Sequence, residues 1–370
     1  MTVYLDEAAT TMPRRDVLAA MGPYLGPVFG NPSSHHSAGE QARRGLDQAR
    51  ADVAEALGGR PGEVVLTSGG TEADNLAVKG LALAAPRGRH VVVSAIEHPA
   101  VLESARWLGR LGFEVTELGV DADGRVAPDD LAAVLRDDTT LVSVQHASNE
   151  VGTVQPVTEL AAVAAERGVP FHVDAVQSAP WLDLDVGRLG VTALSLSGHK
   201  LGTPKGIGAL WVRRGTPLEP LAHGGGQESG RRSGTENVAG AVGLAAALRL
   251  VDRSVVPAVA GRRDALVDRV LAGVSGARLT GHATERLPGH ASFVLPGRSG
   301  ESVLLDLDRR GFACSSGSAC HAGSDEPSHV LTAMGLEREV AQTAVRLTFG
   351  PHVTDDALAA AADALVAVAR

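Results

Sequence analysis

The chain is poor in cysteine and in aromatic residues. Only two cysteines, Cys314 and Cys320, occur in 370 residues, and Phe, Trp and Tyr together make up 3%. A secreted scaffold held together by disulfides would carry more cysteines. The longest apolar run, residues 238–248, is too short to span a bilayer, and the first residues lack the pattern of a signal peptide. We therefore expect a cytoplasmic protein without a membrane segment.

An excess of basic residues is also missing. The formal net charge is −9, whereas a nucleic-acid binder needs a basic surface for the phosphates. Basic pairs such as Arg213-Arg214 and Arg231-Arg232 are present, but pairs of this kind are more often solvated than part of a binding patch. Direct binding of nucleic acid is therefore not expected.

The chain has 370 residues, of which 44% are hydrophobic, and this is enough to form two domains. Short β-branched runs alternate with Ala/Leu-rich segments of helical spacing. The predicted strands are 63–67, 90–96, 140–147, 171–175, 192–197 and 208–212, and the predicted helices are 72–85, 99–111, 128–136 and 156–167. This alternation predicts an α/β fold with a mostly parallel, doubly wound sheet, in which ligands bind beyond the carboxyl ends of the strands.

The pattern changes after about residue 250. Helical spacing continues, but the strands become weaker and no longer alternate regularly with helices. The predicted helices are 257–274, 300–310 and 355–369, and the predicted strands lie near 290–295 and 343–348. We expect this part of the chain to form a smaller α+β domain.

The segment TSGGTEADN, residues 67–75, follows a predicted strand and opens a predicted helix. Backbone N–H groups at such a helix start can bind a phosphate, with glycines allowing close approach and Thr71 adding a hydroxyl. The alternative is an ordinary strand–helix turn with Thr71 as N-cap, and the segment alone does not decide between the two. It has neither a Walker lysine nor the dinucleotide fingerprint, so it is not a standard nucleotide loop.

The segment SLSGHKLGTPKGIG, residues 195–208, places Lys200 just past a predicted strand. A lysine at this position could form a Schiff base with a carbonyl compound such as pyridoxal phosphate (PLP), and Ser197 and His199 could contact the phosphate or the ring. Taken alone, a lysine is more often a solvated surface charge.

Asp174 ends the predicted strand of FHVDAVQSA, residues 171–179. A carboxylate buried there must find a partner. The pyridinium nitrogen of PLP is one such partner, and the pairing keeps the ring protonated. For a single aspartate, a helix N-cap or a structural salt bridge is the commoner role.

His98 and Cys320 complete the set. An imidazole at the end of strand 90–96 could stack on a cofactor ring and move protons near neutral pH, although a lone histidine is more often structural. Cys320 lies in CSSGSACHAGSDE, a small polar segment that suits an exposed thiol, and its spacing matches no standard zinc site, so no metal is expected. A phosphate cradle, a lysine, an aspartate, an imidazole and a thiol together favour a PLP site.

These motifs resemble those of the cysteine desulfurases of the NifS-like group, which are PLP-dependent proteins of the aminotransferase class V type. The resemblance runs from Tyr4 to about Gly350. It rests on the segments YLDEAATT, GNPSSHH, TSGGTEADN, EHPAV, SNEVGTVQP, FHVDAVQS, SGHK, GGGQESGRRSGTEN, SSGSAC and PSHVL, and on the segment around Arg346. It implies fold type I, with a large PLP-binding domain, residues 15–250, around a mostly parallel seven-stranded sheet. Residues 1–14 and 251–370 would form the small domain that carries the catalytic cysteine loop.

The resemblance implies roles for the residues that match the family motifs. Lys200 would carry PLP covalently, Asp174 would pair with the pyridine nitrogen, and Gln177 would contact the phenolate oxygen. His98 would stack on the ring and move protons. The phosphate would be held by Gly70, Thr71, Ser197 and His199, and by Thr235 of the partner subunit in a homodimer.

The substrate side of the site is implied in the same way. Asn149, which would also contact the cofactor, and Arg346 would bind the carboxylate of L-cysteine. The freed Lys200 amine would remove the α-proton, and Cys320 would take the sulfur as a persulfide, leaving L-alanine, before an acceptor protein collects it. Cys314 follows RRGFA at the edge of the predicted small-domain core, so we expect a small buried hydrophobe there and not the nucleophile.

Four positions depart from the family's usual pattern, namely Glu7, Ser148, Thr203 and Thr348. None of them removes a residue with an implied role, although Glu7 and Ser148 could tune the substrate site. The SSGSAC form of the thiol segment resembles the NifS-like group and not the SufS-like group.

Two other functions remain open on the sequence. Another PLP reaction on the same fold, such as that of a selenocysteine lyase or an aminotransferase, would use many of the same residues, but an aminotransferase has no need of a mobile cysteine. An inactive subunit of a sulfur-transfer complex would retain the cofactor weakly, and the intact set of Lys200, Asp174 and Cys320 argues against it. The sulfur could serve iron–sulfur clusters, tRNA thiolation, thio-cofactors or DNA phosphorothioation.

Overall fold

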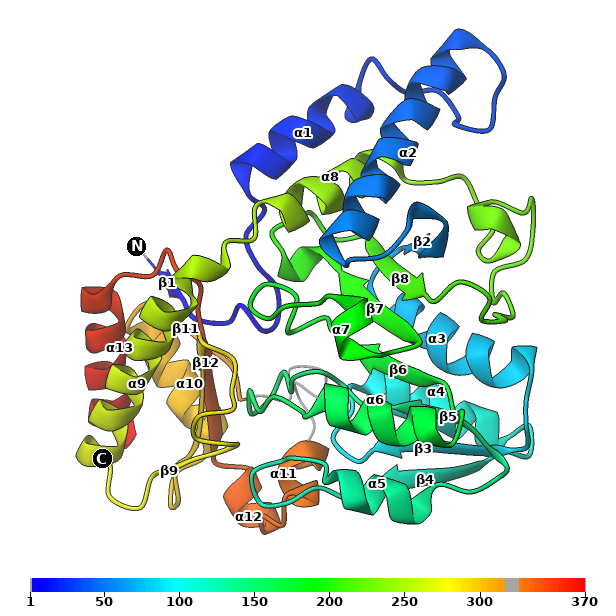
Figure 1. Cartoon of the computed structure of the whole chain (residues 1–370). Helices are drawn as coiled ribbons and strands as arrows, with labels where there is room; N and C mark the ends of the chain where they lie inside the picture. The colour runs from blue at the N-terminus through cyan, green and yellow to red at the C-terminus, as the bar shows by residue number, and fades with distance from the viewer. Residues whose placement is uncertain (1, 317–325, 370) are drawn as a thin grey trace.

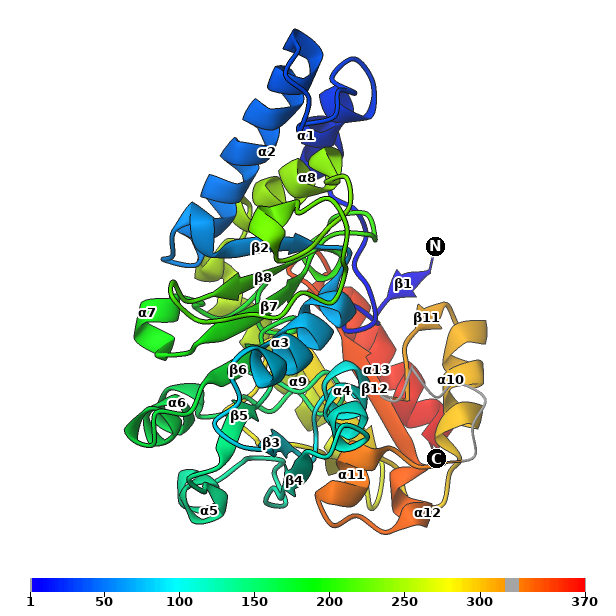
Figure 2. The same cartoon turned by 90° about the vertical axis from the view of Figure 1, so that its right-hand side faces the viewer.

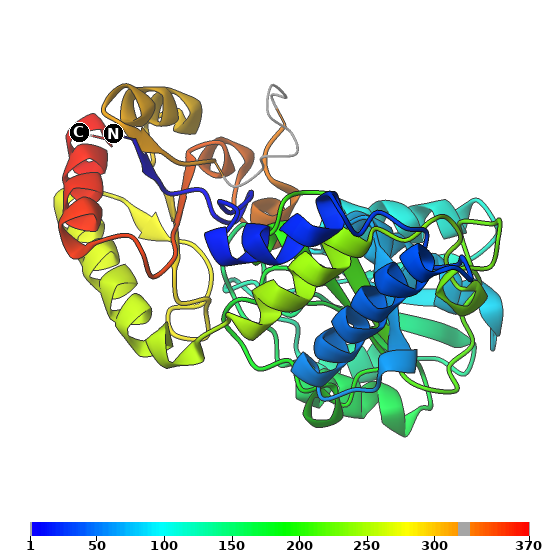
Figure 3. The ribbon, with the colours of Figure 1, turned by 90° about the horizontal axis from the view of Figure 1, so that it is seen from above.

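The computed structural model describes residues 2–316 and 326–369. The described chain has a larger part, built on a central sheet, and a smaller part that contains both termini (Figures 1 and 3). None of the described helices is long and apolar enough to cross a membrane.

Seven strands form the central sheet in the order β2-β8-β7-β6-β5-β3-β4. All neighbouring pairs are parallel except the two that involve β8, which runs antiparallel to β2 and β7. The strands are β2 (Val64–Thr67), β3 (His90–Ser94), β4 (Glu114–Leu118), β5 (Thr139–Ser143), β6 (Phe171–Asp174), β7 (Ala193–Ser197) and β8 (Gly208–Val212). The predicted α/β fold with a mostly parallel sheet is confirmed.

Helices cover both faces of this sheet (Figure 2). One face packs against α3 (Gly70–Ala84) and α4 (Pro99–Gly109). The other face packs against α5 (Pro128–Val134), α6 (Val157–Glu166), α7 (Val186–Leu189) and α8 (Val238–Arg249), with α1 (Arg15–Leu25) and α2 (Ser37–Ala56) outside α8. Burial on both faces explains why the central strands are nearly continuous apolar runs.

Six strands of this sheet were predicted from their apolar runs, and β4 was not. This strand lies at the edge of the sheet, where Glu114 and Glu117 are exposed and Leu118 is buried. A half-solvated edge strand has no continuous apolar run, so its residues carry no clear strand pattern. Helices α1, α2, α7 and α8 were also absent from the predicted elements.

The smaller part contains a three-stranded antiparallel sheet in the order β12-β10-β9 and a two-stranded parallel pair, β1-β11. Its strands are β1 (Val3–Tyr4), β9 (Arg278–Leu279), β10 (His290–Val294), β11 (Phe312–Ala313) and β12 (Ala344–Thr348). Its helices are α9 (Val256–Gly273), α10 (Gly300–Arg309), α11 (His329–Ala333), α12 (Arg338–Ala341) and α13 (Asp355–Ala369). Four short 3-10 turns complete the described elements, namely η1 (Pro61–Glu63), η2 (Gly198–Lys200), η3 (Glu228–Gly230) and η4 (Arg253–Val255).

The N-terminal segment joins the smaller part. Leu5 is fully buried in the same apolar core as Phe293 and Leu347, and β1 pairs with β11. The segment then crosses to the larger part, where the Thr11 N–H donates to the carbonyl of His199. This crossing brings residues 6–11 to the carboxyl ends of β6 and β7. The division of the chain at residues 14 and 250 stays a prediction.

Candidate functional site

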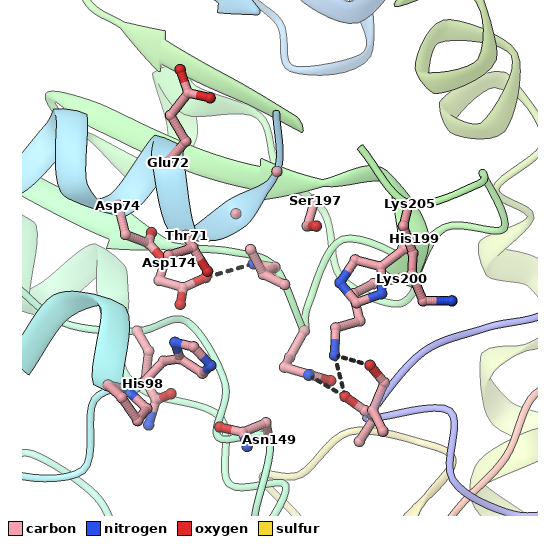
Figure 4. Close-up of a pocket in the computed structure, with 18 of the residues that line it drawn as sticks. Thr71, Glu72, Asp74, His98, Asn149, Asp174, Ser197, His199, Lys200 and Lys205 are labelled. Atoms are coloured by element: carbon pink, nitrogen blue, oxygen red, sulfur yellow. Dashed lines mark hydrogen bonds between the residues drawn. The ribbon is translucent and has the colours of Figure 1, made fainter. Parts of the chain in front are cut away.

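A cavity of about 460 Å³ lies beyond the carboxyl ends of the central strands (Figure 4). It takes residues from both parts of the chain. Ten of the predicted site residues line it, namely Gly70, Thr71, His98, Asn149, Asp174, Gln177, Ser197, His199, Lys200 and Arg346. Of the other two, Thr235 is exposed and lies outside the lining of this cavity, and Cys320 lies outside the described residues.

Lys200 reaches the cavity because β7 ends at Ser197 and the 3-10 turn η2 follows directly. Its Nζ donates to the carbonyl oxygens of Ala8 and Ala9, the latter at 2.9 Å. The side-chain amide of Gln177 also donates to the Ala8 carbonyl, at 2.9 Å. The N-terminal segment therefore orients both side chains on one wall of the cavity.

Asp174 ends β6 and is 7% exposed. Its Oδ1 accepts the Val176 N–H at 2.8 Å. Burial raises the pKa of Asp174 to about 6, although the Val176 N–H and the positive charge of Lys200 lower it. A carboxylate that remains ionised in such a place favours a cationic partner in the cavity.

Another side of the cavity is formed by the start of α3 at Gly70. The N-cap is Gly69, and no side chain caps this helix, so the alternative in which Thr71 is the N-cap is wrong. A Cβ on Gly70 would lie 2.9 Å from Cγ2 of Val176 and 3.2 Å from Cβ of Ser197. Glycine thus allows strand and helix to approach closely, and it leaves uncapped N–H groups for an anion.

His98 is the N-cap of α4, and its Nδ1 accepts the Ala100 N–H at 3.1 Å. Burial and, secondly, the charge of Lys200 lower the pKa of His98 to about 4. The ring is therefore neutral near pH 7, and its proton is on Nε2 because Nδ1 is an acceptor. His98 can therefore cap α4 and also move protons at the cavity, so the structural and catalytic roles left open by the sequence do not exclude each other.

Arg346 lies on β12 and is 1% exposed. Its Nη1 donates to the main-chain oxygen of Asn149 at 2.8 Å, and its Nη2 donates to Oδ1 of Asp6 at 2.8 Å. These contacts fix the guanidinium at the cavity wall, where it can bind a carboxylate.

The four residues that depart from the family pattern have local partners. Thr348 accepts the Ala8 N–H at 2.8 Å, Thr203 donates to the Pro204 carbonyl at 2.7 Å, and the Ser148 hydroxyl accepts backbone N–H groups of the following turn. Glu7 lies 3.5 Å from Nε2 of the exposed His352, and burial raises the pKa of Glu7 to about 7.

Several residues of the cavity lining were not predicted, among them Asp74, Glu150, Lys205 and His329. Asp74 had one usable signal, because it follows Gly70 by four residues and so shares its helix face. His329 occurs in PSHVL, but nothing in that segment alone indicates that α11 packs near His98, and such a contact is a tertiary property.

Cys314 lies on the edge of the core of the smaller part and is half-buried. Burial, reinforced by the negative charge of Asp6, raises the pKa of its thiol to about 12. It is thus almost entirely protonated at neutral pH, which makes it a poor nucleophile.

The described residues fit PLP. The cavity combines a lysine, a buried carboxylate, a neutral imidazole and a helix start without a side-chain cap. A cation such as a protonated pyridine suits Asp174, a phosphate suits the uncapped start of α3, and an aldehyde suits the Lys200 amine.

Comparisons with known proteins agree with this chemistry. The chain matches the family model "Aminotransferase class-V" over residues 3–360. It is 45% identical over 361 residues to the cysteine desulfurase IscS of Dictyoglomus turgidum, covering 96% of this chain and 91% of that protein. Among solved structures, a NifS-like protein matches with a TM-score of 0.91 and 34% identity, covering 100% of this chain and 99% of the other. The structure of SspA in complex with cysteine matches with a TM-score of 0.85 and 37% identity, covering 95% and 99%.

Proposed function

Because the chain belongs to the aminotransferase class-V family and is a PLP-dependent cysteine desulfurase, we propose specific roles for its residues in converting L-cysteine to L-alanine. Lys200 holds the cofactor, Asp174 pairs with its ring nitrogen, and Cys320 receives the sulfur. The larger part, residues 15–250, binds PLP, and residues 1–14 and 251–370 form the domain that carries the thiol.

The cofactor supplies an electron-withdrawing ring that stabilises negative charge at the α-carbon of the bound amino acid. The Lys200 amine removes the α-proton, and Asp174 keeps the proton on the ring nitrogen. His98 stacks on the ring and moves a proton at Nε2, and Gln177 contacts the phenolate oxygen. The phosphate is held by Gly70, Thr71, Ser197 and His199.

The substrate carboxylate binds Arg346 and the Asn149 side chain. The thiolate of Cys320 forms a bond with the substrate sulfur as the carbon–sulfur bond breaks. The electron pair of the broken bond stays with the carbon, which takes up a proton, so the sulfur remains on Cys320 as a persulfide and the carbon skeleton leaves as alanine. L-cysteine as substrate is supported by the structure of SspA, which was solved in complex with cysteine. The persulfide then passes to an acceptor protein in the cytoplasm.

We further propose a homodimer in which Thr235 completes the phosphate site of the neighbouring subunit. Its exposure and its position outside the cavity of its own chain support this. The loop that carries it is held to the larger part by Glu228, which accepts from Arg50 at 2.6 and 2.7 Å.

The observation that carries the proposal is that Lys200 and Asp174 line one cavity beside the glycine-opened start of α3. The test is borohydride reduction of the yellow holoenzyme, followed by peptide mass spectrometry. We expect the pyridoxyl mass on Lys200 and its loss in Lys200→Ala. A pyridoxyl mass on another lysine of the wild-type chain would contradict the proposal. Alanine formation without an added keto acid separates the reaction from transamination.

A further inference from the structure

A row of polar side chains lies between the central sheet and α3, beneath the cavity. The hydroxyl of Ser143 lies 2.8 Å from Nδ1 of His172, and Nε2 of His172 lies 2.9 Å from the hydroxyl of Ser195. Ser195 also lies close enough to Asp74 to influence the pKa of its carboxyl. Because β5, β6 and β7 are neighbours in the sheet, the row runs across three strands and ends on α3.

The row is dry and carries no positive charge. Its four side chains are at most 2% exposed. Burial lowers the pKa of His172 to about 3, so that this imidazole is neutral and provides no counter-charge for Asp74. Oδ1 of Asp74 lies 3.8 Å from Nε2 of His172 and has no hydrogen-bond partner among the described residues.

The row ends beside the carboxylate that the proposed function assigns to the cofactor. Asp74 and Asp174 line the same cavity, and Figure 4 shows them next to each other. Burial, followed by the neighbouring Asp174, raises the pKa of Asp74 well above its usual range, although Ser195 lowers it. Glu97, which is fully buried behind the same wall, also faces this pair, and burial raises its pKa to about 8.

The positive charge of Lys200 lowers the pKa of Asp174 and is not among the causes of the shift at Asp74. Two adjacent carboxylates in a dry site cannot both ionise without large cost. Asp174, with a pKa of about 6 and a backbone N–H on its Oδ1, is the member that ionises.

We propose that Asp74 is a positioning residue that stays protonated and closes the row as a hydrogen-bond donor to Ser195, so that Asp174 carries the only negative charge of this pair toward the cofactor ring. The Ser195 hydroxyl then donates to Nε2 of His172, and Nδ1–H of His172 donates to Ser143. This inference rests on the proposed function, in which Asp174 pairs with the cofactor ring. It adds Asp74 as the residue that keeps Asp174 ionised by remaining neutral itself.

The proposal predicts that an amide replaces Asp74 well, because Asn is a neutral donor of nearly the same shape. In Asp74→Asn, the affinity of the PLP-free chain for added PLP should stay within about threefold of wild type, which is a difference below the 1.4 kcal/mol of a tenfold change. The pH midpoint of the visible absorbance of the holoenzyme should also be unchanged. A loss of PLP affinity as large as that of Asp174→Asn would overturn the proposal, since it would mean that Asp74 acts as an anion.

A second measurement needs no cofactor. At pH 7 the folded chain holds a proton on Asp74 that the unfolded chain releases, so Asp74→Asn should release about one proton fewer on unfolding, as obtained from the pH dependence of Tm and the unfolding enthalpy. The exposed Asp129→Asn is the matched control and should not change this number. An unchanged proton count in Asp74→Asn would overturn the proposal. If Asp174→Asn binds PLP like wild type, the proposed role of Asp174 fails instead, and the proton count still reports on Asp74.

Discussion

The guanidinium of Arg346 donates from Nη2 to Oδ1 of Asp6 at 2.8 Å, across 340 residues of sequence. Its Nη1 contacts the main chain of Asn149 from the larger part. One side chain on β12 thus joins the N-terminal segment, the smaller sheet and the wall of the cavity. The same contacts orient the guanidinium for a substrate carboxylate.

Replacement of Arg346 by Lys should raise KM for L-cysteine about tenfold or more and change kcat less. The ammonium of lysine keeps the positive charge, but it lacks the planar guanidinium with which arginine contacts Asp6, Asn149 and a substrate carboxylate at the same time. Steady-state alanine formation gives both constants. Arg269→Lys, at the exposed pair with Asp363, is the control and should leave KM unchanged. An unaltered KM in Arg346→Lys would show that Arg346 does not bind the substrate carboxylate.

The affinity of the PLP-free chain for PLP should fall as the pH drops below about 6. The pKa of Asp174 is raised to about 6, so its carboxylate is present above that pH and is lost below it. Quenching of tryptophan fluorescence by PLP at pH 5, 6, 7 and 8 measures the effect. Asp174→Asn should bind weakly at every pH, and an equally steep pH dependence in this variant would assign the titration to another group.

Replacement of Glu228 by Ala should lower the free energy of unfolding by about 3–5 kcal/mol, because it leaves the Arg50 charge without its partner in a largely buried place. Glu228 is 5% exposed and also accepts the Leu66 N–H at 2.9 Å. Denaturant unfolding checks the value. Glu114→Ala, which breaks an exposed pair with Arg136, should cause no measurable change. Similar free energies of unfolding in the two variants would show that the contact between Glu228 and Arg50 contributes little to stability.

Mixing Lys200→Ala chains with Thr235→Ala chains should restore activity if sites are shared between subunits. In a mixed dimer, the subunit with intact Lys200 receives an intact Thr235 from its neighbour, so one site is complete. Alanine formation is measured after subunit exchange has been verified by native mass spectrometry. Activity no higher than the mean of the separate variants would contradict the shared site.

The sequence predicted six of the seven strands of the central sheet because these six are buried on both faces and therefore mostly apolar. It also predicted ten of the residues that line the cavity, because Asp174 ends β6, Lys200 follows β7, and parallel strands end at one edge of the sheet. It missed β4, whose exposed glutamates interrupt the apolar pattern. Asp74 and His329 were missed because their relevance depends on which side chains surround them, which local patterns do not encode.

The roles of the site residues stay predictions, and the two cysteines offer the sharpest test of them. Cys314 has a pKa raised to about 12 by burial and by Asp6, so its thiolate is scarce at neutral pH and its contribution should be small. Cys314→Ser should therefore retain most activity, whereas Cys320→Ser should keep the yellow cofactor and lose alanine formation.

The most direct measurement is mass spectrometry of the wild-type enzyme after brief exposure to L-cysteine and a blocking alkylator. The account predicts an additional sulfur on the peptide that contains Cys320 and none on Cys314. A persulfide on Cys314 with Cys320 unmodified would contradict it.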